Sequence, residues 1–180
     1  GFATDAIHAG VRPDPTTGAV MTPIYQTSTY AYEGLGRGKG YDYARTINPT
    51  RSALEENLAV LEGGKAAYAF ASGMAAISAA MGSTLVAGDE VIAHPVLYGC
   101  THSLLTNWYP RLGFGVQRID MNEVDKLRRA ITDKTRILYF ESPVNPSLEL
   151  VDIGALRALA DEVNKARAQE RRLLIVIDNT

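Results

Sequence analysis

Ser72, Gly73 and Met74 form a tripeptide suited to binding a phosphate group. They follow the apolar run 66–71 and precede the small-residue stretch 75–85, so we expect a tight turn between a strand and a helix. At such a turn, backbone N–H groups and the Ser72 hydroxyl face an anion at the positive end of the helix dipole. The alternative is an ordinary turn in which Ser72 only caps the helix. Neither GxxxxGK(S/T) nor GxGxxG occurs, which excludes a Walker loop and a dinucleotide fingerprint.

Asp178 and Tyr98 have the chemistry to hold a flat, positively charged ring. Asp178 follows the apolar run 173–177, where an ionised carboxylate is costly unless it meets a cation or several donors. A protonated pyridine nitrogen would be such a cation, and a cap on the following loop is the alternative. Tyr98 precedes Gly99 near an expected helix start, where its ring can stack on a heteroaromatic ligand or simply pack against protein.

The elements that would position these residues alternate between strand and helix. We expect strands at 66–71, 90–93, 116–119, 136–140 and 173–177, and helices at 51–62, 75–85, 98–108, 123–131 and 152–163. This alternation predicts an α/β fold with a mostly parallel sheet and flanking helices. The last strand is entirely apolar and is expected to be buried on both faces. Because ligands bind at the carboxyl ends of such strands, the site is expected there.

Composition narrows the classes of partner. Eighteen basic and twenty acidic residues give a formal charge of −2, and no stripe of Lys or Arg suits a phosphate backbone, so nucleic acid is not an expected partner. No run approaches the roughly 18 apolar residues of a membrane span, so no membrane association is expected and the cytoplasm is the default location. A single cysteine, Cys100, excludes an internal disulfide framework and a cysteine-rich metal site.

The chain resembles the Cys/Met-metabolism family of pyridoxal 5′-phosphate (PLP) enzymes, which includes cystathionine lyases and synthases, homoserine sulfhydrylases and methionine γ-lyase. The resemblance extends over the whole chain. It is carried by YARTINPT at 43–50, LE at 54–55, LEGG at 61–64, SGMAAI at 72–77, GDEV at 88–91, YG at 98–99, ESP at 141–143, NP at 145–146 and DNT at 178–180. It implies the large domain of a fold type I PLP enzyme, incomplete here.

The resemblance also implies roles for two residues near the start of the chain. Tyr43 and Arg45 match a pair that reaches across a dimer interface to the cofactor phosphate of the neighbouring subunit. A guanidinium binds phosphate oxygens bidentately and a phenol adds one donor, although an ordinary surface arginine is the alternative. Residues 1–48 are therefore expected to form an extended arm that contributes to the neighbouring subunit. Residues 49–180 are expected to form the first part of the PLP-binding domain.

The resemblance implies a set of cofactor-binding residues, most of which lie within residues 72–180. The expected cofactor-binding residues are Tyr43, Arg45, Ser72, Gly73, Met74, Tyr98, Asn145, Asp178 and Thr180. Within this set, Gly73 and Met74 match backbone phosphate donors, and Tyr98 matches the ring-stacking tyrosine. Asn145 matches an asparagine near the cofactor oxygen and the substrate carboxylate, and Asp178 matches the partner of the pyridinium nitrogen. Glu141 fits a family position that we interpret as structural support.

The resemblance implies a longer, oligomeric enzyme. The lysine that holds the cofactor covalently and the arginine that holds the substrate carboxylate lie beyond position 180 in the family. The five lysines of this chain lie in sequence contexts that would not activate an amine. We therefore expect a segment of a longer chain, inactive alone, that works as a homo-oligomer, as a dimer of dimers.

The segment 98–102 resembles the methionine γ-lyase branch, because Cys100 stands where other branches more often carry glycine. This favours α,γ-elimination from methionine or a related thioether amino acid, giving a thiol, ammonia and 2-oxobutyrate, with Tyr98, Cys100 and Asp178 as catalytic residues. In the alternative, Cys100 only fills space. Three other functions remain open: a cystathionine γ-lyase, an O-acetylhomoserine sulfhydrylase or cystathionine γ-synthase, and a non-catalytic fragment.

Overall fold

Four parallel strands form the sheet of this computed structural model, which describes residues 1–180. The strands are β1 (Glu90–Ala93), β2 (Gly115–Arg118), β3 (Thr135–Glu141) and β4 (Leu174–Asp178), in the order β2-β1-β3-β4. β3 is buried along its whole length because it lies inside the sheet. The expected α/β fold with a parallel sheet is confirmed, and the expected strands at 90–93, 116–119, 136–140 and 173–177 agree with it to within one residue at most ends.

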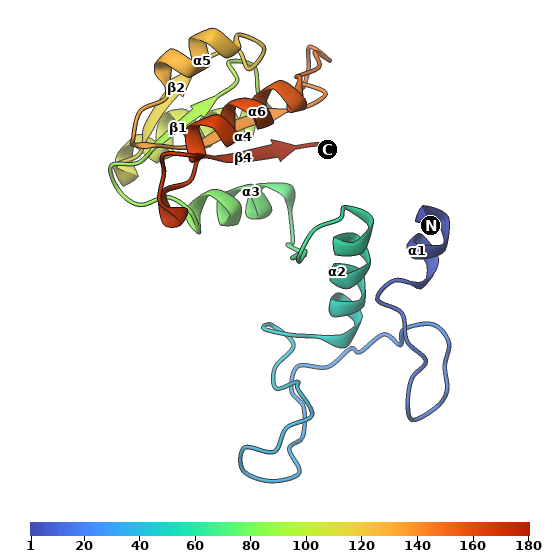
Figure 1. Ribbon diagram of the computed structural model, residues 1–180. Helices are drawn as coiled ribbons and strands as arrows, with labels where there is room; N and C mark the ends of the chain where they lie inside the picture. The colour runs from blue at the N-terminus through green and yellow to red at the C-terminus, as the bar shows by residue number, and fades with distance from the viewer. The chain divides into compact units, whose positions relative to one another are not determined.

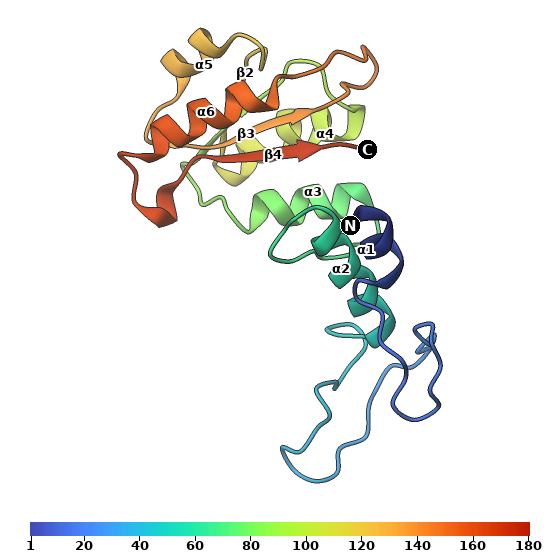
Figure 2. The same ribbon diagram turned by 45° about the vertical axis from the view of Figure 1, so that its right-hand side comes forward.

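Helices cover both faces of this sheet (Figures 1 and 2). On one face lie α5 (Val124–Ala130) and α6 (Ile153–Asn164), which bury Leu127, Leu156 and Leu159 against Leu138 and Phe140 of β3. On the other lie α3 (Gly73–Gly82) and α4 (Gly99–Ser103), with a core that includes Met81, Leu105 and Tyr139. Neighbouring residues of β3 therefore enter different cores, as the period of a strand requires.

The helix expected over 98–108 is shorter and less regular than predicted. α4 gives way to a π-helical turn, η1 (Leu104–Trp108), and then to a 3₁₀ turn, η2 (Tyr109–Leu112). Gly113 ends the 3₁₀ turn with φ of 83°, a left-handed conformation that glycine adopts without strain. A further 3₁₀ turn, η3 (Gln169–Arg171), precedes β4.

The chain divides into two units, residues 1–70 and 71–180. The first contains α1 (Phe2–His8) and α2 (Pro49–Leu61), joined by extended segments. Asn57 on α2 donates its side-chain amide to the carbonyls of Asp5, Ala6 and Ala9, and so holds the end of α1. α1 was not predicted, because its residues show no helical period. The expected boundary at 48/49 separates an arm from the cofactor domain, whereas the division at 70/71 separates two compact units. The expected boundary stays a prediction.

Two expectations about strands were wrong. Residues 66–70 are extended but pair with no strand, and Tyr68 and Phe70 are exposed. The sheet of this chain ends at β2 and β4, so the segment has no neighbour to complete a ladder. β4 is not buried on both faces: Leu174 and Ile177 are more than one-third exposed, because β4 is the edge strand.

A buried ionic cluster lies at the amino end of β1. The Asp89 carboxylate, 3% exposed, accepts a hydrogen bond from Arg171 at 2.8 Å and from the Val86 N–H at 3.0 Å. The oxygen that accepts from Val86, Oδ2, also lies 3.9 Å from Nε of Arg136, which is buried too. Arg136 donates to the carbonyls of Glu170 and Arg172, so the cluster joins β1, β3 and η3.

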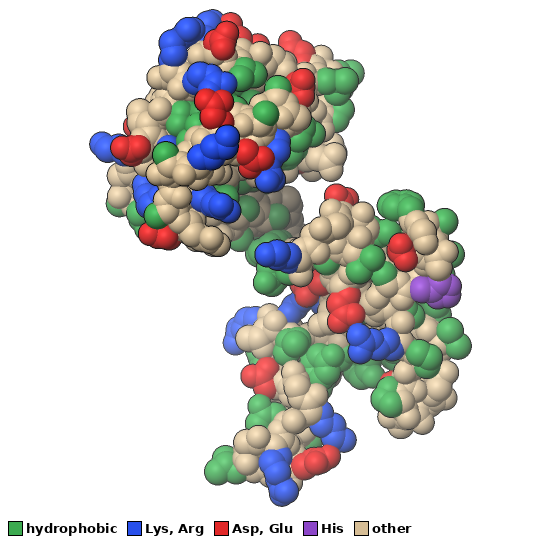
Figure 3. Space-filling view, viewed as in Figure 1, with side chains coloured by type: hydrophobic (Ala, Val, Ile, Leu, Met, Phe, Trp, Pro, Cys, Tyr) green, Lys and Arg blue, Asp and Glu red, His purple; other side chains and the backbone are tan.

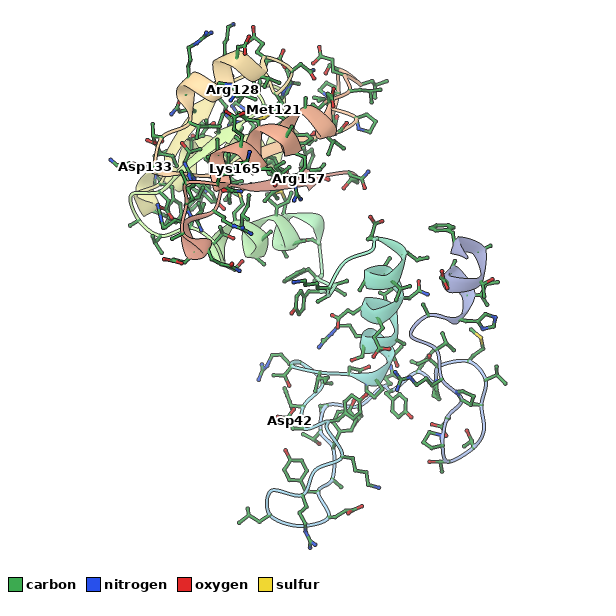
Figure 4. The ribbon with its side chains drawn as sticks, viewed as in Figure 1. Asp42, Met121, Arg128, Asp133, Arg157 and Lys165 are labelled. Atoms are coloured by element: carbon green, nitrogen blue, oxygen red, sulfur yellow. The ribbon has the colours of Figure 1, made fainter.

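Surface charges of opposite sign are interspersed over the visible face of the second unit (Figure 3). Arg128 of α5 pairs with Glu162 of α6, and Arg157 pairs with Asp161 one turn later on α6. Arg128 and Arg157 are labelled in Figure 4. No helix is long and apolar enough to cross a membrane.

Candidate functional site

A pocket of about 340 Å³ opens at the carboxyl ends of β3 and β4, within the second unit. Its lining residues are Ser72, Gly73, Met74, Ile77, Tyr98, Glu141, Pro143, Asn145, Asp178 and Thr180. They come from the start of α3, the start of α4, the two strand ends and the loop after β3. The structure therefore brings together every expected cofactor-binding residue between 72 and 180.

The expected phosphate turn is the amino end of α3. The Ser72 side-chain oxygen accepts a hydrogen bond from the Ala75 N–H at 3.1 Å, so Ser72 does cap the helix. The cap uses the Ser72 oxygen as an acceptor and leaves its hydrogen free to donate. The N–H groups of Gly73 and Met74 belong to the first helical turn, which has no partners within the helix. Capping and anion binding are thus compatible at this turn.

Glu141 fixes two walls of the pocket. It is 3% exposed, and its Oε1 accepts from the Tyr98 N–H at 2.6 Å while Oε2 accepts from the Asn145 N–H at 3.1 Å. Both bonds go to backbone amides, so Glu141 sets where Tyr98 and Asn145 enter the pocket. This geometry supports a structural role for Glu141.

Replacing Glu141 with glutamine should therefore destabilise the pocket. Glutamine keeps one acceptor oxygen and turns an NH₂ group toward the second backbone amide, which leaves a buried N–H unpaired. The free energy of unfolding of the full-length protein should fall by about 1–3 kcal/mol, as measured by urea denaturation. Glu149→Gln is a matched control, because the Glu149 side chain is 57% exposed. Equal effects from the two variants would contradict this reading.

Tyr98 and Cys100 are joined by a side-chain contact. Cys100 Sγ lies 3.4 Å from the Tyr98 hydroxyl oxygen, and both residues are exposed. This hydrogen bond raises the pKa of Tyr98 above its ordinary value of 10.0. The phenol is therefore neutral near pH 7 and can donate a proton. Tyr98 is 44% exposed, so one side of its ring is available to a ligand.

Asp178 lies at the end of β4, where the pocket meets the sheet. Its Oδ1 accepts from the Thr180 N–H at 3.1 Å and from the Thr180 hydroxyl at 2.7 Å. Asp178 thus caps the loop that follows β4, which was the alternative to ligand binding, and it also lines the pocket. Both bonds use Oδ1, which leaves Oδ2 for another partner.

Tyr43 and Arg45 belong to the first unit, whereas the pocket residues all belong to the second. Both side chains are exposed, and the guanidinium carbon of Arg45 lies 4.9 Å from the centre of the Tyr43 ring. This cation–π contact leaves the donors of Arg45 free for an anion. Their expected role across a subunit interface stays a prediction.

Tyr139 on β3 was not foreseen as a site residue. It is fully buried and lines a second pocket, of about 220 Å³, which shares Gly73, Ile77, Asp178 and Thr180 with the first. In the sequence it resembled any core residue of a strand. The two-residue spacing from Tyr139 to Glu141 was the available signal, because it places both side chains on one face.

The residues present fit a flat phosphorylated ring. Anion donors lie at the start of α3, a phenol at the start of α4, and a carboxylate at the end of β4, and Met74, Ile77 and Pro143 supply apolar surface between them. The structure contains no group of three His, Cys, Asp or Glu residues that could hold a metal ion. Lys165, labelled in Figure 4, follows α6 and lines a different pocket, together with Leu174 at the start of β4.

Comparisons with known proteins identify one family of enzymes. A sequence profile described as "Cys/Met metabolism PLP-dependent enzyme" matches residues 3–180. An L-methionine gamma-lyase of Pseudomonas deceptionensis is 42% identical over 188 residues, covering 100% of this chain and 45% of that protein. A probable cystathionine gamma-synthase of Herpetosiphon aurantiacus is 44% identical over 180 residues, covering 100% and 54%.

A solved structure agrees with these sequence matches. The cystathionine gamma-lyase from Lactobacillus plantarum, complexed with L-serine, superposes with a TM-score of 0.89 at 39% identity, and the match covers 100% of this chain and 45% of that one. The chain thus spans about half the length of the relatives it matches.

Proposed function

Since the chain belongs to the Cys/Met-metabolism family of PLP-dependent enzymes, we propose that its parent protein is a carbon–sulfur lyase that releases a thiol from methionine or a related thioether amino acid. The observation that carries the proposal is the shared pocket of Ser72, Tyr98 and Asp178, with Cys100 bonded to the Tyr98 hydroxyl. The products would be the thiol, ammonia and 2-oxobutyrate, and the reaction an α,γ-elimination.

The family implies pyridoxal 5′-phosphate as cofactor. Gly73, Met74 and Ser72 would hold its phosphate, Tyr98 would stack on its ring, and Asp178 would pair with the ring nitrogen. When bound, PLP supplies a protonated ring that withdraws electrons from the reacting carbon atoms of the substrate. Asn145 and Thr180 would lie beside it.

Each side chain of the pocket then has a separate task. Asp178, held by Thr180, provides a fixed negative charge that stabilises a cationic nitrogen. The neutral Tyr98 hydroxyl donates its proton to the departing sulfur, and Cys100 orients that hydroxyl through the 3.4 Å contact. Met74, Ile77 and Pro143 reduce access of water to the reacting atoms.

We also propose that two subunits complete each site. Tyr43 and Arg45 are exposed, and the donors of Arg45 suit a phosphate group of a neighbouring subunit. In this arrangement residues 1–48 act as an arm and residues 49–180 begin the cofactor domain. Exchange of arms makes a homodimer, and we propose that two such dimers assemble.

A second candidate is a cystathionine γ-synthase or cystathionine lyase, because relatives with those names are as similar to the chain as the methionine gamma-lyase is. The full-length protein should be assayed for methanethiol from methionine, for cysteine or homocysteine from cystathionine, and for cystathionine or homocysteine from O-acetylhomoserine with cysteine or sulfide. We expect methanethiol to be the fastest product. Absence of methanethiol, with either other product formed, would favour the second candidate.

A further inference from the structure

The Tyr139 hydroxyl is a buried polar group without a partner. Tyr139 is fully buried, and no hydrogen bond of normal length and angle reaches its hydroxyl within the chain, although the Thr101 hydroxyl and the Asp178 carboxylate both lie near it. An unpaired buried hydroxyl is destabilising relative to a paired one. Phenylalanine would fill the same volume without this cost, so the hydroxyl calls for an explanation.

The sheet register places this hydroxyl on the face of the sheet that carries the pocket. In the β3–β4 ladder, Tyr139 is opposite Val176 and Glu141 is opposite Asp178. Side chains two residues apart point the same way, so Tyr139, Glu141 and Asp178 share one face. The 220 Å³ pocket is lined by both Tyr139 and Asp178.

Toward an ionised carboxylate, the Tyr139 hydroxyl can act only as a hydrogen-bond donor. Burial raises the pKa of its phenol, and the nearby carboxylates of Asp178 and Glu141 raise it further, so it stays neutral. Glu141 already accepts two backbone amides. Asp178 has both its hydrogen bonds on Oδ1, so Oδ2 is a free charged acceptor, whereas the neighbouring Thr101 hydroxyl is neutral and already contacts Met74.

We infer that Tyr139 is a positioning residue whose hydroxyl donates to the Asp178 carboxylate and holds it toward the ring nitrogen of the bound cofactor. This inference rests on the proposed function, because it assumes that Asp178 meets that nitrogen. Thr180 donates to Oδ1 of Asp178, and Tyr139, which lines the same pocket, would donate to Oδ2. The unpaired hydroxyl is then paired when the site is loaded.

The test is Tyr139→Phe in the full-length protein, stripped of cofactor and titrated with pyridoxal 5′-phosphate while visible absorbance is followed. We expect the dissociation constant to rise by about tenfold or more, the change for one hydrogen bond to a charged group. Thermal unfolding of the cofactor-free protein should not become easier, because phenylalanine removes an unpaired hydroxyl. Tyr109→Phe is the matched control, since Tyr109 is buried in the same core and lies outside the pocket lining.

A double-mutant cycle with Asp178→Asn separates the two proposals. If Tyr139 acts through Asp178, Tyr139→Phe should change cofactor affinity much less in the Asp178→Asn background. An unchanged affinity in Tyr139→Phe, with Asp178→Asn weakened, would overturn the inference and leave the proposed function intact. Unchanged affinity in both would overturn the proposed function as well. A cofactor-free Tyr139→Phe protein that unfolds more easily or fails to fold would also overturn the inference, because the hydroxyl would then have a structural partner.

Discussion

Asp178→Asn in the full-length protein should lower kcat/KM by roughly 100-fold or more, the largest loss we expect from any single substitution in the pocket. Removal of one member of a buried charge pair costs about 3–5 kcal/mol, which corresponds to about 150- to 5,000-fold. Asparagine keeps the shape of aspartate, and its oxygen can still accept the two bonds from Thr180. The lost quantity is therefore the negative charge that would keep the ring nitrogen protonated.

Steady-state kinetics and the visible spectrum of the cofactor together test this prediction. Thr180→Val is the graded control: it removes only the 2.7 Å hydroxyl bond to Asp178, keeps the charge, and should cost much less than Asp178→Asn. A kcat/KM in Asp178→Asn within about fivefold of the wild type would mean that Asp178 does no more than cap the end of β4, and the proposed mechanism would fail.

Asp89→Asn should cause the largest loss of stability, at the opposite end of the sheet. The substitution removes the carboxylate charge beside the buried Arg136, and the single amide oxygen of asparagine cannot accept from both Arg171 and the Val86 N–H. Breaking a buried ion pair on one side costs about 3–5 kcal/mol, which urea denaturation of the full-length protein would measure. Asp161→Asn is the control, because the 2.8 Å Arg157–Asp161 pair on α6 is exposed and should contribute little. Similar losses in the two variants would contradict a special role for Asp89.

The same cluster gives a pH dependence with a definite sign. Burial alone would raise the pKa of Asp89, but hydrogen bonds from Arg171 and the Val86 N–H outweigh it and lower the pKa below 3.8. A carboxyl with a lowered folded pKa stabilises the fold above its unfolded pKa and loses this effect as pH falls through the folded value. Wild-type stability should therefore decline below about pH 4, the unfolded value of such a carboxyl, and Asp89→Asn should lack part of that decline. Parallel curves for the two proteins would show that Asp89 takes no part.

The sequence predicted the sheet and most of the pocket because both depend on local patterns. Alternating apolar runs located the four parallel strands, and Asp178 follows one of them directly. Ser72 was recognised from its place between an apolar run and a helix, and the structure has it as the N-cap of α3. In parallel sheets such positions meet at one edge. Asn145 and Thr180 were expected only from the family resemblance.

Features that depend on distant contacts were not predictable in this way. The apolar pattern of 66–71 resembles a strand, but pairing requires a neighbour, and the chain provides none. α1 is held by the Asn57 amide, 48 residues away from Ala9 along the chain, and has no strong period of its own. The unpaired hydroxyl of Tyr139 is visible only once the packing of its surroundings is known.

Glu141 makes the tyrosine wall and the asparagine loop mechanically dependent on each other. One oxygen of the carboxylate accepts from the Tyr98 N–H and the other from the Asn145 N–H. A bulky substrate that displaces Asn145 would therefore also shift the start of α4 and tilt the ring of Tyr98. Attempts to re-engineer selectivity at position 145 should therefore be screened together with position 98. A library that varies only one of the two positions would miss combinations in which both segments adjust to the same Glu141 carboxylate.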